Sequence, residues 1–133
     1  MALLAAESSN HFRAIFSFGP VEDIRGYGVE FMPFDWSNAV EVDARNPLKW
    51  LGSIRNRTFV IEGAVEPGNV SSLKAMASAS TNPQVSFLAV PRANHFNILA
   101  PVTKLIAEKI KRDDGTTTNI ALADHELKLN YAP

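Results

Sequence analysis

An imidazole at the end of a predicted strand is the first candidate for chemistry in this 133-residue sequence. His95 follows an apolar run, Val85–Val90, and a short polar turn, Pro91–Asn94, and a helical pattern begins after it. Open α/β sheets collect ligands and reacting groups at the carboxyl ends of their parallel strands. Because an unperturbed histidine side chain titrates near neutral pH, His95 is a candidate general acid or base.

Carboxylates follow the preceding predicted strand. The apolar run Thr58–Glu62 ends at Gly63, and Glu66 lies in the loop beyond it. Since parallel strands end at the same edge of a sheet, a carboxylate of this loop could meet His95. On spacing alone, Glu66 could equally be a loop carboxylate that interacts favourably with the dipole of the helix predicted from about Asn69.

Other chemistries find little support in the sequence. It contains no cysteine, which excludes disulfides, thiolate catalysis and cysteine-based metal sites. The histidines His11, His95 and His125 are dispersed, so we expect no metal and no cofactor. The segment Gly26-Tyr27-Gly28 is typical of a turn rather than of a phosphate-binding loop.

Charge and hydropathy exclude two classes of partner. The 13 lysines and arginines nearly balance the 14 aspartates and glutamates, so the formal net charge is −1 and we expect no nucleic acid partner. The apolar stretch Met1–Ala6 ends at Glu7 and has no basic leader, so we expect neither a signal peptide nor a membrane span. The default expectation is a cytoplasmic protein.

The elements that must position these residues alternate along the chain. Apolar runs bounded by glycine, proline and asparagine predict strands over residues 14–18, 58–62 and 85–90. Helical patterns cover residues 1–8, 40–46, 48–51, 69–79, 98–110 and 121–129. This order predicts a three-layer α/β/α domain around a short parallel sheet of about three strands. We expect residues 1–113 to form the domain and residues 114–133 to form a linker and a C-terminal helical tail.

A long irregular connection over residues 20–38 separates the first strand from the next helix. Such a loop in a compact domain is usually functional. Its aromatic residues either line a substrate pocket or cover the core; they are Tyr27, Phe31, Phe34 and Trp36.

Three blocks of sequence together resemble a known family. Ile54–Gly63 looks like a strand that leads to an acid loop, Asn82–Phe96 like a strand that leads to a catalytic histidine, and Ile98–Ile110 like a terminal helix. In this order and spacing they resemble the C-terminal half of the catalytic domain of the α/β-hydrolase family, in its prolyl-oligopeptidase and dipeptidyl-peptidase branch of serine hydrolases.

The resemblance implies a catalytic order of serine, acid and histidine. His95 would be the general base and Glu66 the acid that orients it, with Glu62 and Asp35 as rival acids. The G-x-S-x-G motif of the nucleophile is absent, and Met1–Glu7 resembles the helix that follows that motif. The expectation is therefore a truncated, peptidase-like or esterase-like serine hydrolase that is inactive alone, with a small ester or peptide as its substrate class.

The serines of the sequence offer no replacement for that nucleophile. Ser17 lies near the end of the first predicted strand, on the same edge as His95, but none of the serines has the glycine context of a nucleophile turn. The alternative expectation is a non-catalytic, self-associating scaffold domain.

Self-association is expected in either case. The predicted first strand, Ala14–Phe18, is apolar and has no neighbour on one side. Exposed edges of this kind recruit partners. We expect a two-fold homodimer in which these strands pair antiparallel and residues 1–6 pack across the axis.

Overall fold

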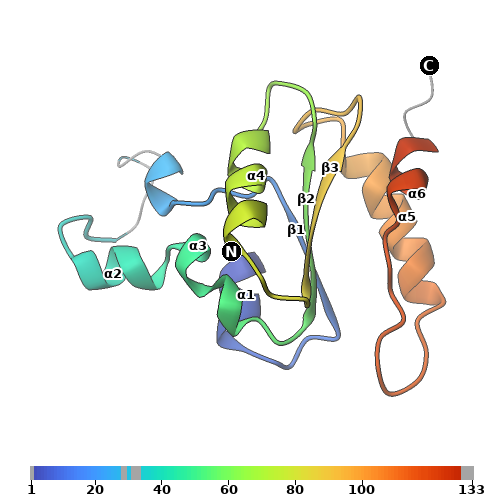
Figure 1. Ribbon diagram of the computed structural model, residues 1–133, viewed down its shortest axis with the longest axis horizontal. Helices are drawn as coiled ribbons and strands as arrows, with labels where there is room; N and C mark the ends of the chain where they lie inside the picture. Colours follow the sequence, from blue (N-terminus) through green and yellow to red (C-terminus); the bar gives the residue numbers. More distant parts are fainter. Residues whose placement is uncertain (1, 28–29, 31–33, 130–133) are drawn as a thin grey trace.

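A computed structural model describes residues 2–27, 30 and 34–129 of the chain (Figure 1). The α-helices are α1 (Ala2–Ser8), α2 (Ala39–Ala44), α3 (Pro47–Trp50), α4 (Val70–Ala79), α5 (Leu99–Lys111) and α6 (Asp124–Leu129). The strands are β1 (Ala14–Phe18), β2 (Arg57–Gly63) and β3 (Val85–Val90), and two short 3₁₀ helices are η1 (Ile24–Tyr27) and η3 (Leu51–Ser53). None of the described helices combines the length and apolar character that crossing a bilayer requires.

The three strands form one parallel sheet in the order β1-β2-β3. Ile15 is level with Thr58 on the neighbouring strand, and Val60 is level with Phe87. The predicted three-stranded parallel sheet is thereby confirmed, and the carboxyl ends of its strands share one edge. Apolar residues at consecutive positions of β2 are buried on both faces, as expected for a central parallel strand.

Helices lie on both sides of this sheet. In Figure 1, α1 and α4 lie on one side, and α5 and α6 on the other. The first side holds a buried cluster that includes Leu3, Ile15, Val60, Leu73 and Met76. The second side holds a cluster that includes Phe59, Ile61, Leu88, Val102, Ile106 and Leu127. Burial of each such side chain stabilises the fold by about 1.5–3 kcal/mol before the entropy of ordering is counted.

The chain after α5 belongs to the core. Ile120, Leu122 and Leu127, in the segment expected to be a linker and tail, are buried against the α5 side of the sheet. The last helix begins at Asp124 rather than at the predicted residue 121, because the Ala123 N–H donates to the Glu126 carboxylate at 2.9 Å and caps the first turn. Residues 130–133 of the expected tail lie outside the described residues.

The described aromatic residues of the long connection belong to neither core cluster. Phe34 and Trp36 stack on one another with ring centroids 5.3 Å apart, and the Arg45 guanidinium lies 5.0 Å from the centroid of the Phe34 ring. Tyr27 is exposed. Phe31 lies outside the described residues. Among the described residues, these aromatic side chains therefore do not cover the sheet.

Candidate active site

The carboxyl ends of β2 and β3 bring a carboxylate and an imidazole together. Nδ1 of His95 lies 3.0 Å from Oε2 of Glu62. The Glu62 side chain is fully buried, whereas 37% of the His95 side chain is exposed. One partner is thus fixed in the protein interior while the other reaches solvent.

Strand geometry explains why Glu62 points inward at this place. Side chains alternate across a strand, so Glu62 faces the same side of the sheet as Val60, which packs in the cluster beneath α4. Its carboxylate accepts hydrogen bonds from the N–H groups of Gly63 at 2.7 Å and Asn69 at 3.2 Å. Asn69 is the N-cap residue of α4, where the helix dipole favours negative charge.

A network of asparagine side chains and backbone groups sets the position of His95. Oδ1 of Asn94 accepts from the N–H groups of Phe96 and Asn97, each at 3.0 Å, and Oδ1 of Asn97 accepts from the Asn94 N–H at 2.8 Å. These bonds close a turn directly before α5. The His95 N–H donates to the carbonyl of Pro67 at 3.0 Å, which ties this turn to the loop after β2.

Glycines allow the three strand ends to approach one another around the pair. A Cβ at Gly19, just after β1, would overlap Cε1 of His95, and Gly19 has a φ of 62°. A Cβ at Gly63 would lie 2.5 Å from the carbonyl oxygen of Ala93, and one at Gly68 would lie 3.3 Å from Oε1 of Glu62. Larger residues at positions 19 and 63 would therefore force the imidazole or its loop to move.

The arrangement defines the chemistry open to His95. Two backbone N–H groups donate to the Glu62 carboxylate, and Nδ1 of His95 lies at hydrogen-bond distance from the same group. In the tautomer that donates from Nδ1 to this carboxylate, Nε2 offers a lone pair. A carboxylate that orients an imidazole in this way prepares Nε2 to take a proton from a hydroxyl or a water. The ring of Phe96 meets the imidazole edge-on at 5.2 Å.

The structure separates the candidate acids. Glu66, expected to be the partner of His95, instead accepts from the N–H of Gly68 at 2.8 Å in the loop after β2. Asp35 accepts from the backbone N–H and the hydroxyl of Ser37, and these bonds hold the pKa of its carboxyl below the usual value. The rival acid Glu62 is the one whose carboxylate lies at hydrogen-bond distance from Nδ1 of His95.

Ser17 lies on β1 and is buried. None of the hydrogen bonds among the described residues joins a serine hydroxyl to His95. No group of three histidine, aspartate or glutamate residues with metal-binding geometry occurs in the part of the chain that the structure describes.

Sequence reasoning missed the supporting residues Gly19, Gly68 and Asn69. In the sequence, Gly19 directly follows the predicted first strand, Gly68 lies in the loop after the second, and Asn69 begins a helix, but only the fold shows which side chains these residues face.

No family model matches the sequence, and neither the curated proteins nor the solved structures contain a match to it.

Proposed function

We propose that this chain carries the base and the acid of a serine-hydrolase-type catalytic site, with His95 as the general base and Glu62 as the carboxylate that orients it. The proposal rests on one observation: Nδ1 of His95 lies 3.0 Å from a fully buried carboxylate that also accepts two backbone N–H groups. An acid bound in this way keeps the imidazole in one tautomer and stabilises the imidazolium formed during proton transfer.

The order of the elements supports the same proposal. An acid at the carboxyl end of one parallel strand and a histidine after the next, followed by a helix, resembles the C-terminal half of an α/β-hydrolase domain. Helices on both sides of the sheet fit the three-layer arrangement of that fold. In this proposal Glu62 takes the role that the resemblance gave to Glu66.

The substrate class that follows is a small ester or peptide. Nε2 of His95 would accept a proton from the attacking hydroxyl and return it to the leaving group. The G-x-S-x-G nucleophile motif is absent from this sequence. The chain alone should therefore lack serine-hydrolase turnover, and water in place of the serine hydroxyl should give only slow hydrolysis of activated esters, with no covalent intermediate on a serine.

Hydrolysis of p-nitrophenyl acetate by the purified chain tests the proposal. His95→Gln should abolish the protein-dependent rate, and Glu62→Gln should lower it by about tenfold or more because the ring loses its orienting carboxylate. Glu66→Gln is the matched control, since it removes an equal charge from the neighbouring loop, and its rate should stay within about twofold of wild type.

Two further measurements make the outcome decisive. The Nδ1 proton of His95 should give a downfield NMR signal that Glu62→Gln removes and Glu66→Gln retains, while dispersed backbone amide signals in each spectrum show that both variants are folded. Intact mass after treatment with a fluorophosphonate should show no adduct. Wild-type rates in His95→Gln and Glu62→Gln, or an adduct on one of the chain's serines, would contradict the proposal.

A second candidate function is a non-catalytic scaffold that associates with itself. The observation that favours it is the position of β1, which pairs only with β2 among the described strands. Ala14, Phe16 and Phe18 of this edge strand are only half-buried. In this proposal the edge strands of two copies pair antiparallel and join the two sheets into one.

A further inference from the structure

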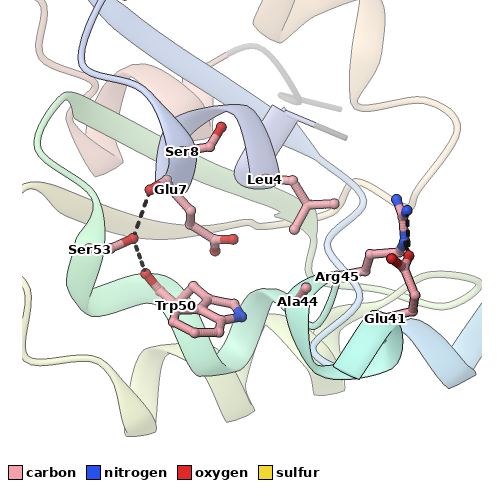
Figure 2. Close-up of a pocket in the computed structure, with 8 residues that line it drawn as sticks. All are labelled: Leu4, Glu7, Ser8, Glu41, Ala44, Arg45, Trp50 and Ser53. Carbon is pink, nitrogen blue, oxygen red and sulfur yellow. Dashed lines mark hydrogen bonds and ion pairs between the residues drawn. The ribbon is translucent and has the colours of Figure 1, made fainter. Parts of the chain in front are cut away.

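A pocket with a buried carboxylate lies away from the candidate active site. It lies between α1 and the chain from α2 to η3, and its volume is about 590 Å³ (Figure 2). Glu7 extends from α1 toward Trp50 and Ala44 in this pocket, and Leu4 lies beside it. Volumes of about 300–1,000 Å³ are typical of small-molecule sites.

The described residues leave the Glu7 carboxylate without a hydrogen-bond partner. Both of its oxygens are buried, and no described residue donates to either. Burial raises the pKa of Glu7 to about 8, although the positive charge at the start of the chain opposes this shift. A buried acid without donors is costly when it is ionised. A ligand that brings its own N–H donors and a positive charge would remove that cost.

The basic residue of the pocket is engaged elsewhere. Nε and Nη2 of Arg45 both donate to Oε2 of Glu41, at 2.9 and 2.6 Å, and the Arg45 guanidinium also lies 5.0 Å from the centroid of the Phe34 ring. These contacts hold Arg45 away from Glu7, as Figure 2 shows. Arg45 therefore does not donate to the Glu7 carboxylate.

The surroundings of Glu7 select among cations. Two free oxygens on one carboxylate match the forked N–H groups of a guanidinium, which binds carboxylates in a bidentate manner. Trp50 supplies an indole held in place because its Nε1 donates to the carbonyl of Asp43 at 2.7 Å, and guanidinium groups stack on such rings. Leu4 and Ala44 are apolar surface for the methylene groups that such a ligand carries.

We propose that the pocket between α1 and α2–η3 binds a guanidinium group, with Glu7 as its bidentate acceptor and Trp50 as its stacking partner. The guanidinium belongs either to a small molecule or to an arginine side chain of a peptide. This site is independent of the proposed hydrolase function, because it shares no residue with the Glu62–His95 pair.

Calorimetric titration of the purified chain tests the proposal with probes that differ in one property each. Agmatine represents the small-molecule source, and the tripeptide acetyl-Gly-Arg-Gly-amide represents the arginine side chain. Acetyl-Gly-citrulline-Gly-amide is the uncharged control for the arginine tripeptide. Agmatine, the arginine peptide or both should bind, while the citrulline peptide should bind at least about tenfold more weakly because it lacks the charge.

Glu7→Gln should weaken binding of the active probe by at least about tenfold, since the amide offers one acceptor and no charge. Glu108→Gln on α5 makes the same substitution at an exposed position and should bind like wild type. The NMR signal of the Trp50 indole N–H should shift on binding in wild type, and dispersed backbone amide signals in Glu7→Gln show that this variant is folded.

Binding of agmatine alone identifies a small-molecule site, and binding of the peptide alone identifies an arginine side chain; both results support the proposal. It is overturned by undiminished binding to Glu7→Gln, by equal affinity for the citrulline peptide, or by no binding of either guanidinium probe at millimolar concentration.

Discussion

At the scale of single residues, the candidate active site depends on a position that has no side chain, Gly19, as well as on the side chains of Glu62 and His95. Gly19 lies against the imidazole of His95, and its backbone has a φ of 62° that side chains other than glycine rarely adopt. The Glu62–His95 contact therefore depends on the glycine directly after β1, although this glycine forms no hydrogen bond to either residue.

Gly19→Ala should displace the His95 ring from Glu62. The new Cβ would overlap Cε1 of the ring, and the positive φ adds a strain of about 1–3 kcal/mol. We expect the downfield Nδ1 proton signal to disappear and the unfolding midpoint in urea to fall.

Gly52→Ala is the matched control for this change. A Cβ at Gly52 meets nothing within 4 Å. This variant should therefore keep the His95 signal. An unchanged His95 signal in Gly19→Ala would show that the ring tolerates a side chain there and that the close approach is not required.

At the scale of elements, one ion pair joins the start of β1 to the loop that follows α5. Arg13 donates to both carboxylate oxygens of Asp113, and its Nη2 donates to the carbonyl of Asp114 at 2.8 Å. Asp113 also accepts from the Thr118 hydroxyl at 3.1 Å and the Asn119 N–H at 2.9 Å. These bonds fix the turn that returns the chain to the buried segment around Ile120.

Asp113→Asn should destabilise the protein in a pH-dependent way. The hydrogen bond from Arg13 is the main cause that lowers the pKa of Asp113 to about 2 from its usual 3.8. A lowered pKa in the folded state means that the ionised carboxylate stabilises the protein fully above about pH 3.8, and that this contribution is lost as the pH falls toward 2. Urea unfolding across this range measures the effect.

The difference in unfolding free energy between wild type and Asp113→Asn should be largest at neutral pH and should shrink below pH 3.8. Asp114→Asn is the control, because Arg13 contacts the carbonyl of this residue rather than its carboxylate. A difference that stays constant with pH would show that the Asp113 charge is not the cause.

At the scale of the whole molecule, the sheet is small and β1 lies at its edge. It pairs with β2 along one edge. Its two faces are covered only in part, one by α1 and the other by the core cluster that contains α5. Ile15 faces the buried cluster beneath α1, so a charge there would test folding rather than association. Half-buried Ala14, at the start of the strand, is the better position for a test.

Light scattering after gel filtration should give wild type a mass of twice the 14.6 kDa chain. Ala14→Lys should shift the protein to a monomer, because lysine on an edge strand opposes strand pairing. Ala89→Lys introduces the same charge at an exposed position of β3, the opposite edge strand, and should leave the dimer intact. A wild-type monomer at micromolar concentration, or an Ala14→Lys dimer, would contradict pairing through β1.

Much of the architecture was predictable from local sequence. The apolar runs at 14–18, 58–62 and 85–90 are each bounded by glycine, proline or asparagine, and β1, β2 and β3 coincide with them to within one residue. The position of His95 after the third strand followed from the same patterns. The pattern of residues adjacent in sequence is enough for such predictions, since strand and turn preferences are local.

The choice of acid needed the tertiary structure. Glu62 and Glu66 are close in sequence, but alternation along β2 turns Glu62 beneath the start of α4, where Gly63, Asn69 and His95 converge on it. Glu7 is a similar case, because in the sequence it only ends an apolar stretch. Packing of α1 against the chain around Trp50 is what buries its carboxylate. The sequence by itself determined the strands and the imidazole, whereas the partners of both carboxylates depend on distances between segments remote in the chain, which only the folded structure sets.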